Sequence, residues 1–321
     1  MRLPRRQFLH LAAGAAALPV VPRSARAQTY PTRPVRLIAG FPAGGATDIT
    51  ARLIGQWLSE RLGQPFIVEN RPGAATNIAT EAVVRASPDG YTLLMVQAPN
   101  AINATLYDKL NFNFIRDIAP IAGIMRVPLV IDVNPSFPAK TVPEFIAYAK
   151  ANPTRINMAS AGIGTGNHLF GMMTGINMTH VPYRGEALAF TDLLGGQVQV
   201  VFGSLTASIE HIKTGKLRAL AVTTATRWEG TPDIPAVKEF VPDYEASVWF
   251  GVGAPRTTPV AIIDKLNTEI NAALADPKIK ARLADLGGSV LTGSSADFAK
   301  LIADETEKWG KVIRAANIKA E

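Results

Sequence analysis

The chain contains no cysteine in its 321 residues. Disulfide bonds, thiol nucleophiles and thiolate metal sites are therefore excluded. Its histidines are also few and isolated: His168, His180 and His211 have no second histidine three or four residues away. The helical zinc pattern needs that spacing. We expect no metal site, and a lone histidine of this kind is usually structural.

Sequence signatures of catalysis are missing as well. A hydrolase nucleophile needs Gly-x-Ser-x-Gly, but Phe202-Gly203-Ser204-Leu205-Thr206 lacks the second glycine. A dinucleotide site needs Gly-x-Gly-x-x-Gly, and Gly162-Ile163-Gly164-Thr165-Gly166 has the wrong spacing. No catalytic residue and no cofactor is predicted. An exported α/β hydrolase is kept as the less favoured alternative.

The basic excess of the chain is confined to its first residues. Lys plus Arg number 33 against 26 acids, but residues 1–27 hold five arginines and no acid, so 28 basic residues face 26 acids in the remainder. Nucleic-acid binding requires a basic face or stripe. Nothing of that kind is left, and no nucleic-acid partner is predicted.

The N-terminus has the features of an export signal. Arg2 and the pair Arg5-Arg6 precede an apolar run over residues 8–21, and Ala25-Arg26-Ala27 provides small residues around a cleavage point. The arginine pair resembles the twin-arginine signal, which we favour over an ordinary secretory signal. The run is short for a membrane span. We expect cleavage after Ala27 and a periplasmic mature chain.

Strand and helix patterns alternate along the rest of the chain. Residues 35–39, 66–69 and 91–96 read as apolar strands, with helical spacing at residues 47–62 and 77–85 between them. This β-α-β-α-β order is typical of a parallel sheet covered on both faces. A second series of such units follows over residues 142–223, and helices at 258–275, 278–286 and 295–315 complete the chain.

Two long extended segments, residues 121–133 and 248–254, bracket the second series. Two such crossings indicate one domain inserted into another. We predict an α/β protein of two lobes, each a mostly parallel sheet flanked by helices. Lobe 1 would comprise residues 28–132 plus 252–321, and lobe 2 residues 133–251.

The segment Gly40-Phe41-Pro42-Ala43-Gly44-Gly45-Ala46 joins a predicted strand to a predicted helix beginning at Thr47. The first N–H groups of a helix have no internal acceptor, and glycines let a ligand approach them closely. This loop is therefore a candidate anion site, as is the second glycine-rich turn at residues 160–166. Asp48 would organise the first loop rather than meet an anion.

Several motifs in register carry a family resemblance. They are Phe41-Pro42-Ala43-Gly44-Gly45, Val68-Glu69-Asn70-Arg71-Pro72-Gly73-Ala74, Pro88-Asp89-Gly90-Tyr91-Thr92-Leu93, Ala159-Ser160-Ala161-Gly162, His180-Val181-Pro182-Tyr183-Arg184-Gly185 and Asp192-Leu193-Leu194-Gly195-Gly196-Gln197-Val198. Across the mature chain the sequence resembles the Bug family, the substrate-binding components of tripartite tricarboxylate transporters. The resemblance implies a two-lobed periplasmic binding protein of the type II kind, with a ligand cleft between the lobes, and not an enzyme.

The resemblance also implies a ligand and partners: a di- or tricarboxylate or related organic acid, delivered to the transporter's membrane permease subunits. A sensor subunit reporting to a membrane kinase is the alternative, and we expect a monomer. The chain departs from the family pattern at Gln97-Ala98-Pro99-Asn100 and Gly203-Ser204, from which we infer a preference against amino acids. The predicted ligand-binding residues are Ala43, Gly44, Gly45, Ala46, Thr47, Asp48, Gln97, Asn100, Ser160, Ala161, Gly162, Gly164, Thr165, His168, Tyr183, Arg184, Gly185, Glu186 and Ser204.

Arg184 would pair with a distal carboxylate through two parallel hydrogen bonds. An arginine after a strand is, however, more often solvated. Tyr183 could either pack or donate a hydrogen bond, and His168 is a candidate donor near the cleft.

Overall fold

A computed structural model describes residues 30–319, apart from residues 108, 162–173, 177, 243 and 316–317. The predicted signal peptide and its cleavage point after Ala27 lie outside the described residues. So do residues 162–173 of the second predicted series of strands and helices, which include most of the glycine-rich turn at residues 160–166.

The described strands form one continuous sheet in the order β2-β1-β3-β9-β4-β7-β5-β6, with β8 and β10 paired to β4. Their bounds are β1 (Val35–Ala39), β2 (Phe66–Asn70), β3 (Thr92–Gln97), β4 (Ile118–Val133), β5 (Asn157–Ser160), β6 (Thr179–Pro182), β7 (Val200–Ser204), β8 (Arg218–Val222), β9 (Ser247–Pro255) and β10 (Ser289–Val290).

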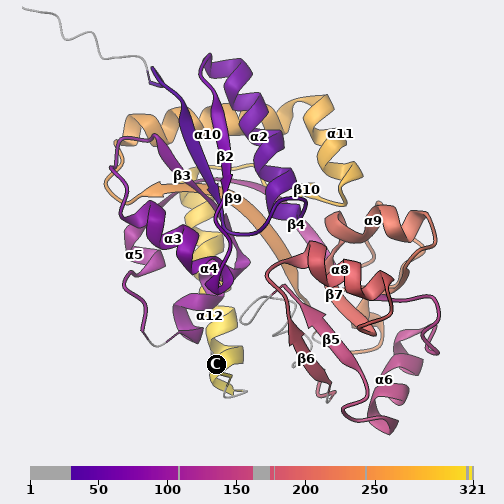
Figure 1. Ribbon diagram of the computed structural model, residues 1–321. Coiled ribbons are helices and arrows are strands. Elements are labelled where there is room, and N and C mark those ends of the chain that lie inside the picture. Colours follow the sequence, from indigo (N-terminus) through magenta and orange to yellow (C-terminus); the bar gives the residue numbers. More distant parts are fainter. Residues whose placement is uncertain are drawn as a thin grey trace, which may run out of the picture.

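Helices flank this sheet in two groups, a larger one around β1 to β3 and a smaller one around β5 to β7 (Figure 1). The helices of the larger group are α2 (Ala46–Leu62), α3 (Asn77–Val84), α4 (Ala98–Leu106), α5 (Phe114–Asp117), α10 (Val260–Ala275), α11 (Pro277–Asp285) and α12 (Ser295–Ala315). Those of the smaller group are α6 (Val142–Ala151), α8 (Glu186–Leu194) and α9 (Leu205–Lys213). Two 3-10 turns, η1 (Ala74–Thr76) and η2 (Val237–Glu239), complete the described elements.

Strand β4 connects the two groups because its pairing changes along its length. From Ile118 to Pro128 it pairs with β9, and from Leu129 onward it pairs with β7 and β8. The buried Thr223 hydroxyl accepts from the Leu129 N–H at 2.8 Å and lies 2.8 Å from the Ala246 carbonyl oxygen. This side chain ties β4 to the segment that leads into β9.

The sheet is mixed, whereas the sequence pattern predicts mostly parallel pairing. The outer pairs β1–β2, β1–β3, β5–β6 and β5–β7 are parallel. The central strands β4 and β9 are antiparallel to each other and to their other neighbours. They are antiparallel because β4 carries the chain from one group to the other and β9 brings it back.

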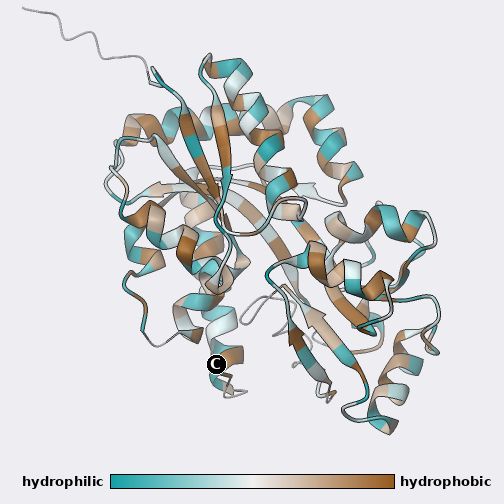
Figure 2. Cartoon of the chain, in the orientation of Figure 1, coloured by the Kyte–Doolittle hydropathy of each residue, from teal (hydrophilic) through white to brown (hydrophobic). Residues whose placement is uncertain are grey.

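Both faces of the sheet are buried, as the near-continuous apolar strands predict. In β1, Leu37 and Ile38 are both 0% exposed and belong to apolar clusters on opposite faces. The buried side of α12 carries Phe298, Ile302, Trp309 and Ile313, and the Phe298 ring lies edge-on to Trp249 of β9, with ring centres 5.8 Å apart. Figure 2 shows brown central strands and helices that are teal on their outward sides.

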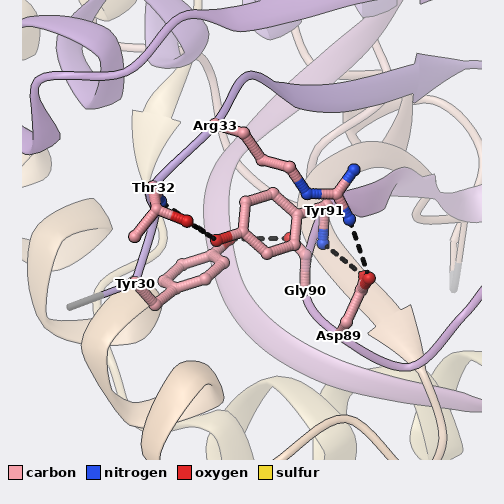
Figure 3. A network of polar contacts seen from close by, with 6 residues as sticks. All are labelled: Tyr30, Thr32, Arg33, Asp89, Gly90 and Tyr91. Carbon is pink, nitrogen blue, oxygen red and sulfur yellow. Dashed lines mark hydrogen bonds and ion pairs between the residues drawn. The ribbon is translucent and has the colours of Figure 1, made fainter. Parts of the chain in front are cut away.

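The first described residues are fixed by a polar and aromatic network on the turn before β3 (Figure 3). The Tyr30 hydroxyl donates to the Gly90 carbonyl oxygen at 2.7 Å, and Arg33 pairs with Asp89 at 3.0 Å. The Arg33 guanidinium also lies 4.1 Å from the centre of the Tyr91 ring. These contacts hold the entry of the chain against the larger group.

None of the helices in the described ranges is long and apolar enough to cross a bilayer.

Candidate functional site

The loop between β1 and α2 ends in an uncapped helix N-terminus. Gly45 is the N-cap residue, and no side chain caps the helix there. The first bond within the helix runs from the Ile49 N–H to the Gly45 carbonyl oxygen. The N–H groups of the first turn are thus free of intrahelical acceptors and available to an anion.

Asp48 holds this loop in place. Its buried carboxylate accepts from the Gly44 N–H, the Arg52 guanidinium and the Asn70 amide, each at 3.0 Å. Burial alone would raise the pKa of Asp48, but these donors outweigh burial and lower it. The carboxylate is therefore already satisfied within the loop, which agrees with the predicted organising role.

Gln97, the last residue of β3, presents a free donor beside this helix start. It is 3% exposed, and its amide oxygen accepts from the Thr47 hydroxyl at 2.7 Å. Its amide nitrogen, Nε2, has no hydrogen-bond partner in the described part of the chain. A buried donor without a partner costs about 1–3 kcal/mol. A ligand oxygen would satisfy it.

The smaller group of elements supplies the opposite wall through the start of α8 and the end of β7. Glu186 accepts from the Ser204 N–H at 3.0 Å and from the Ser204 hydroxyl at 2.6 Å. Gly185 has φ of +153°, and a Cβ atom placed on it would lie 2.9 Å from Cδ of Pro42 in the β1–α2 loop. The two walls are in close contact at this point.

A cleft with about 600 Å³ of space not filled by atoms, part of it open to solvent, lies between these walls. It is lined by Phe41, Pro42, Gly45, Ala46, Thr47, Gln97, Ala98, Pro99, Ala161, Gly185, Glu186, Ala187, Leu188, Ser204, Val248 and Phe250. Across the described ranges, no group of three or more acidic or histidine side chains could hold a metal ion.

A second carboxyl group, Asp132 on β4, is 0% exposed, and neither of its oxygens has a hydrogen-bond partner of good geometry among the described residues. Burial raises the pKa of Asp132 well above its ordinary value, and the charge of Glu186 raises it further. The Ser208 hydroxyl, which donates to the Ser204 carbonyl oxygen at 3.4 Å, lowers the pKa of Asp132 but does not cancel the effect of burial.

Comparison with known proteins identifies the chain. The model of the tripartite tricarboxylate transporter family receptor matches residues 50–318. The chain belongs to this receptor family. It is also 36% identical to the protein BugT of Bordetella pertussis over 300 residues, which cover 91% of this chain and 92% of BugT.

Solved structures of several similar proteins share the fold. An R. palustris protein solved with adipate has a TM-score of 0.87 and 37% identity, with 90% of this chain and 99% of that chain covered. The periplasmic binding protein BugD has a TM-score of 0.87 at 35% identity, covering 91% and 100% of the two chains. MatC from Rhodopseudomonas palustris with bound malate has a TM-score of 0.85 at 30% identity, covering 88% and 100%. The two-lobed α/β class and the solute-binding role are confirmed.

The predicted ligand-binding residues of this receptor fall into three sets. Those that line the cleft are Gly45, Ala46, Thr47, Gln97, Ala161, Gly185, Glu186 and Ser204. Those that lie away from the lining are Ala43, Gly44, Asp48, Asn100, Ser160, Tyr183 and Arg184. Gly162, Gly164, Thr165 and His168 lie outside the described residues.

Several polar side chains of the second set are used for structure. Asn100 accepts from the Gln97 N–H at 2.8 Å and donates to two threonine hydroxyls, so it caps the start of α4. The Tyr183 hydroxyl donates to Asp192 at 2.5 Å. Ser160 contacts His180 at 2.6 Å, and Arg184 is exposed.

The predicted ligand-binding residues omitted most of the apolar residues of the lining, although Ala46 and Ala161 were among them. Ala98, Pro99, Ala187 and Leu188 are neighbours of selected residues, so the extent of each loop could have suggested them. Phe250 carries no such local signal. Pairing of β9 with β3 places it opposite Gln97, and only the tertiary fold provides that pairing.

Proposed function

We propose that this receptor captures a small organic carboxylate with its cleft and delivers it to the membrane subunits of a tripartite tricarboxylate transporter. The carboxylate would bind at the start of α2, between the N–H groups of the first helical turn and Nε2 of Gln97. The unpartnered, buried Nε2 beside an uncapped helix is the observation that carries this assignment. The adipate and malate of two similar structures support the ligand class.

Neutral donors suit a protein that must release its cargo. Each charge-assisted hydrogen bond contributes roughly 1.5–3 kcal/mol. Three or four such bonds hold a carboxylate without a fixed counter-ion, and they exchange readily for water when the lobes separate. The carboxylate of Asp48 stays outside the lining, where its hydrogen bonds shape the loop.

The proposed export, oligomeric state and lobe boundaries rest on the sequence predictions. The mature chain would begin at Gln28 after export to the periplasm and act as a monomer. The lobes would divide at residues 28–132 plus 252–321 and 133–251. The change of partner along β4 and the return of the chain at Ser247 support this division. Replacing Arg5 and Arg6 by lysine would block export only if the twin-arginine route is used.

A thermal-shift panel tests the function. Residues 28–321 are unfolded and refolded to remove bound ligand, and are then heated with mono-, di- and tricarboxylates and with amino acids. A carboxylate at one hundred times its Kd adds about 2.7 kcal/mol to the free energy of unfolding and raises the midpoint. Stabilisation by amino acids alone, or by none of the compounds, would contradict the proposal.

Capture of a permease subunit by the liganded protein from detergent-solubilised membranes supports the delivery role. Capture of a sensor kinase instead would assign the same ligand-binding site to signalling.

A further inference from the structure

The side-chain amide of Gln97 carries a donor and an acceptor, and its orientation determines which of them a ligand meets. The amide oxygen accepts from the Thr47 hydroxyl at 2.7 Å, in a buried contact. Nε2 is thereby left as the atom without a partner among the described residues, and both side chains belong to the cleft lining. The contact with Thr47 therefore makes this part of the cleft a hydrogen-bond donor.

Other contacts fix the backbone of Gln97. Its N–H donates to the Asn100 side chain at 2.8 Å. Asn100 in turn donates to the hydroxyls of Thr76 and Thr80, at 3.0 Å and 2.8 Å. These bonds hold the junction between β3 and α4, whereas the Thr47 hydroxyl acts on the amide group itself. Thr47 can thus influence a ligand through the orientation of Gln97.

We propose that Thr47 is a positioning residue that holds Nε2 of Gln97 in its donor orientation toward the ligand, and that this orientation selects an ionised carboxylate over the corresponding carboxamide. The inference rests on the proposed function and deepens it. A carboxylate has only acceptor atoms, so it matches Nε2 and the N–H groups at the start of α2. A carboxamide sets its own NH2 group against these donors, and a buried donor without an acceptor weakens binding.

Titration calorimetry on the refolded mature chain tests this role. The probes are adipate, malate and the other carboxylates of the thermal-shift panel, each compared with the primary amide of the same carbon skeleton. Thr47→Val keeps the shape of the side chain but frees the Gln97 amide to rotate. Carboxylate affinity should fall roughly three- to tenfold, the equivalent of ordering one side chain on binding, and the carboxylate-to-carboxamide ratio should fall with it. Thr47→Ser, which retains the hydroxyl, should restore both.

The matched control is Thr50→Val. The Thr50 hydroxyl donates to the Ala46 carbonyl oxygen within α2 at 2.7 Å, and Thr50 lies outside the lining. This variant should keep the wild-type ratio of carboxylate to carboxamide affinity. A wild-type ratio in Thr47→Val, or a ratio that Thr47→Ser does not restore, would overturn this inference and leave the proposed function intact.

Gln97→Met tests the proposed function separately, because it removes Nε2 while keeping the length of the side chain. Carboxylate affinity should fall in this variant. Unchanged carboxylate binding by Gln97→Met, or failure of every carboxylate in the panel to bind the wild type, would overturn both proposals.

Discussion

The buried carboxyl group of Asp132 makes a sharp prediction about stability. In the folded chain its pKa is well above the ordinary value because the group is fully buried near Glu186. In the unfolded chain the group has an ordinary pKa of about 3.9. Between these two values the folded state holds a proton that the unfolded state has released, so the free energy of unfolding decreases as the pH rises.

The magnitude follows from the single proton involved. Each pH unit between the two pKa values removes at most about 1.4 kcal/mol from the free energy of unfolding. Asp132→Asn keeps the shape of the side chain but cannot ionise. The variant should therefore gain stability relative to the wild type as the pH rises from 5, by up to about 1.4 kcal/mol per unit, until the folded pKa is reached.

Urea unfolding of both proteins at pH 5, 6, 7 and 8 measures this difference. Asp285→Asn, at an exposed acid at the end of α11, is the matched control for the loss of one acidic group. A difference between Asp132→Asn and wild type that stays constant from pH 5 to 8 would refute the reasoning, because it would mean that Asp132 is ionised and solvated in the folded protein.

Three further substitutions separate binding from folding. Gly45→Val places a branched side chain on the cleft lining and should abolish carboxylate binding with little change in the free energy of unfolding. Gly44→Ala, at φ of +86° and outside the lining, should lower the free energy of unfolding by about 1 kcal/mol and keep the affinity. Urea unfolding measures the stabilities, and equal affinities of the two variants in calorimetry would contradict this prediction. Gly185→Ala forces a Cβ to within 2.9 Å of Pro42 and should weaken carboxylate binding at least about tenfold by holding the two walls of the cleft apart. An unchanged Kd would show that the contact between Gly185 and Pro42 is not needed for binding. Ala75→Gly relieves a left-handed residue, φ 46° and ψ 50°, and should raise the free energy of unfolding by roughly 0.5–1 kcal/mol; a loss of stability in urea would show that the turn is unstrained.

The sequence was informative where a local pattern determines the structure. The glycine loop before α2, strands β1 and β3, and helix α12 all depend on near neighbours. For that reason the strand, turn and helix rules located them. The order of elements likewise predicted the two crossings that form β4 and β9.

Local patterns misled where a residue serves two purposes. The segment Gln97-Ala98-Pro99-Asn100 was expected to supply ligand donors, but α4 begins at Ala98, with Pro99 in the first turn, where proline is well tolerated. The Asn100 side chain could donate to a ligand, but its amide group is used to cap the start of α4. The burial of Asp132 had no signal at all, because an acid in an apolar strand is usually read as solvent-facing.

A crystal structure of the refolded protein with its tightest-binding carboxylate would test the proposed site most directly. The predicted result is a carboxylate oxygen about 2.7–3.2 Å from Nε2 of Gln97, with a further hydrogen bond from a backbone N–H of Ala46 or Thr47. A carboxylate bound instead to the Arg184 guanidinium, with Nε2 of Gln97 unoccupied, would contradict the assignment.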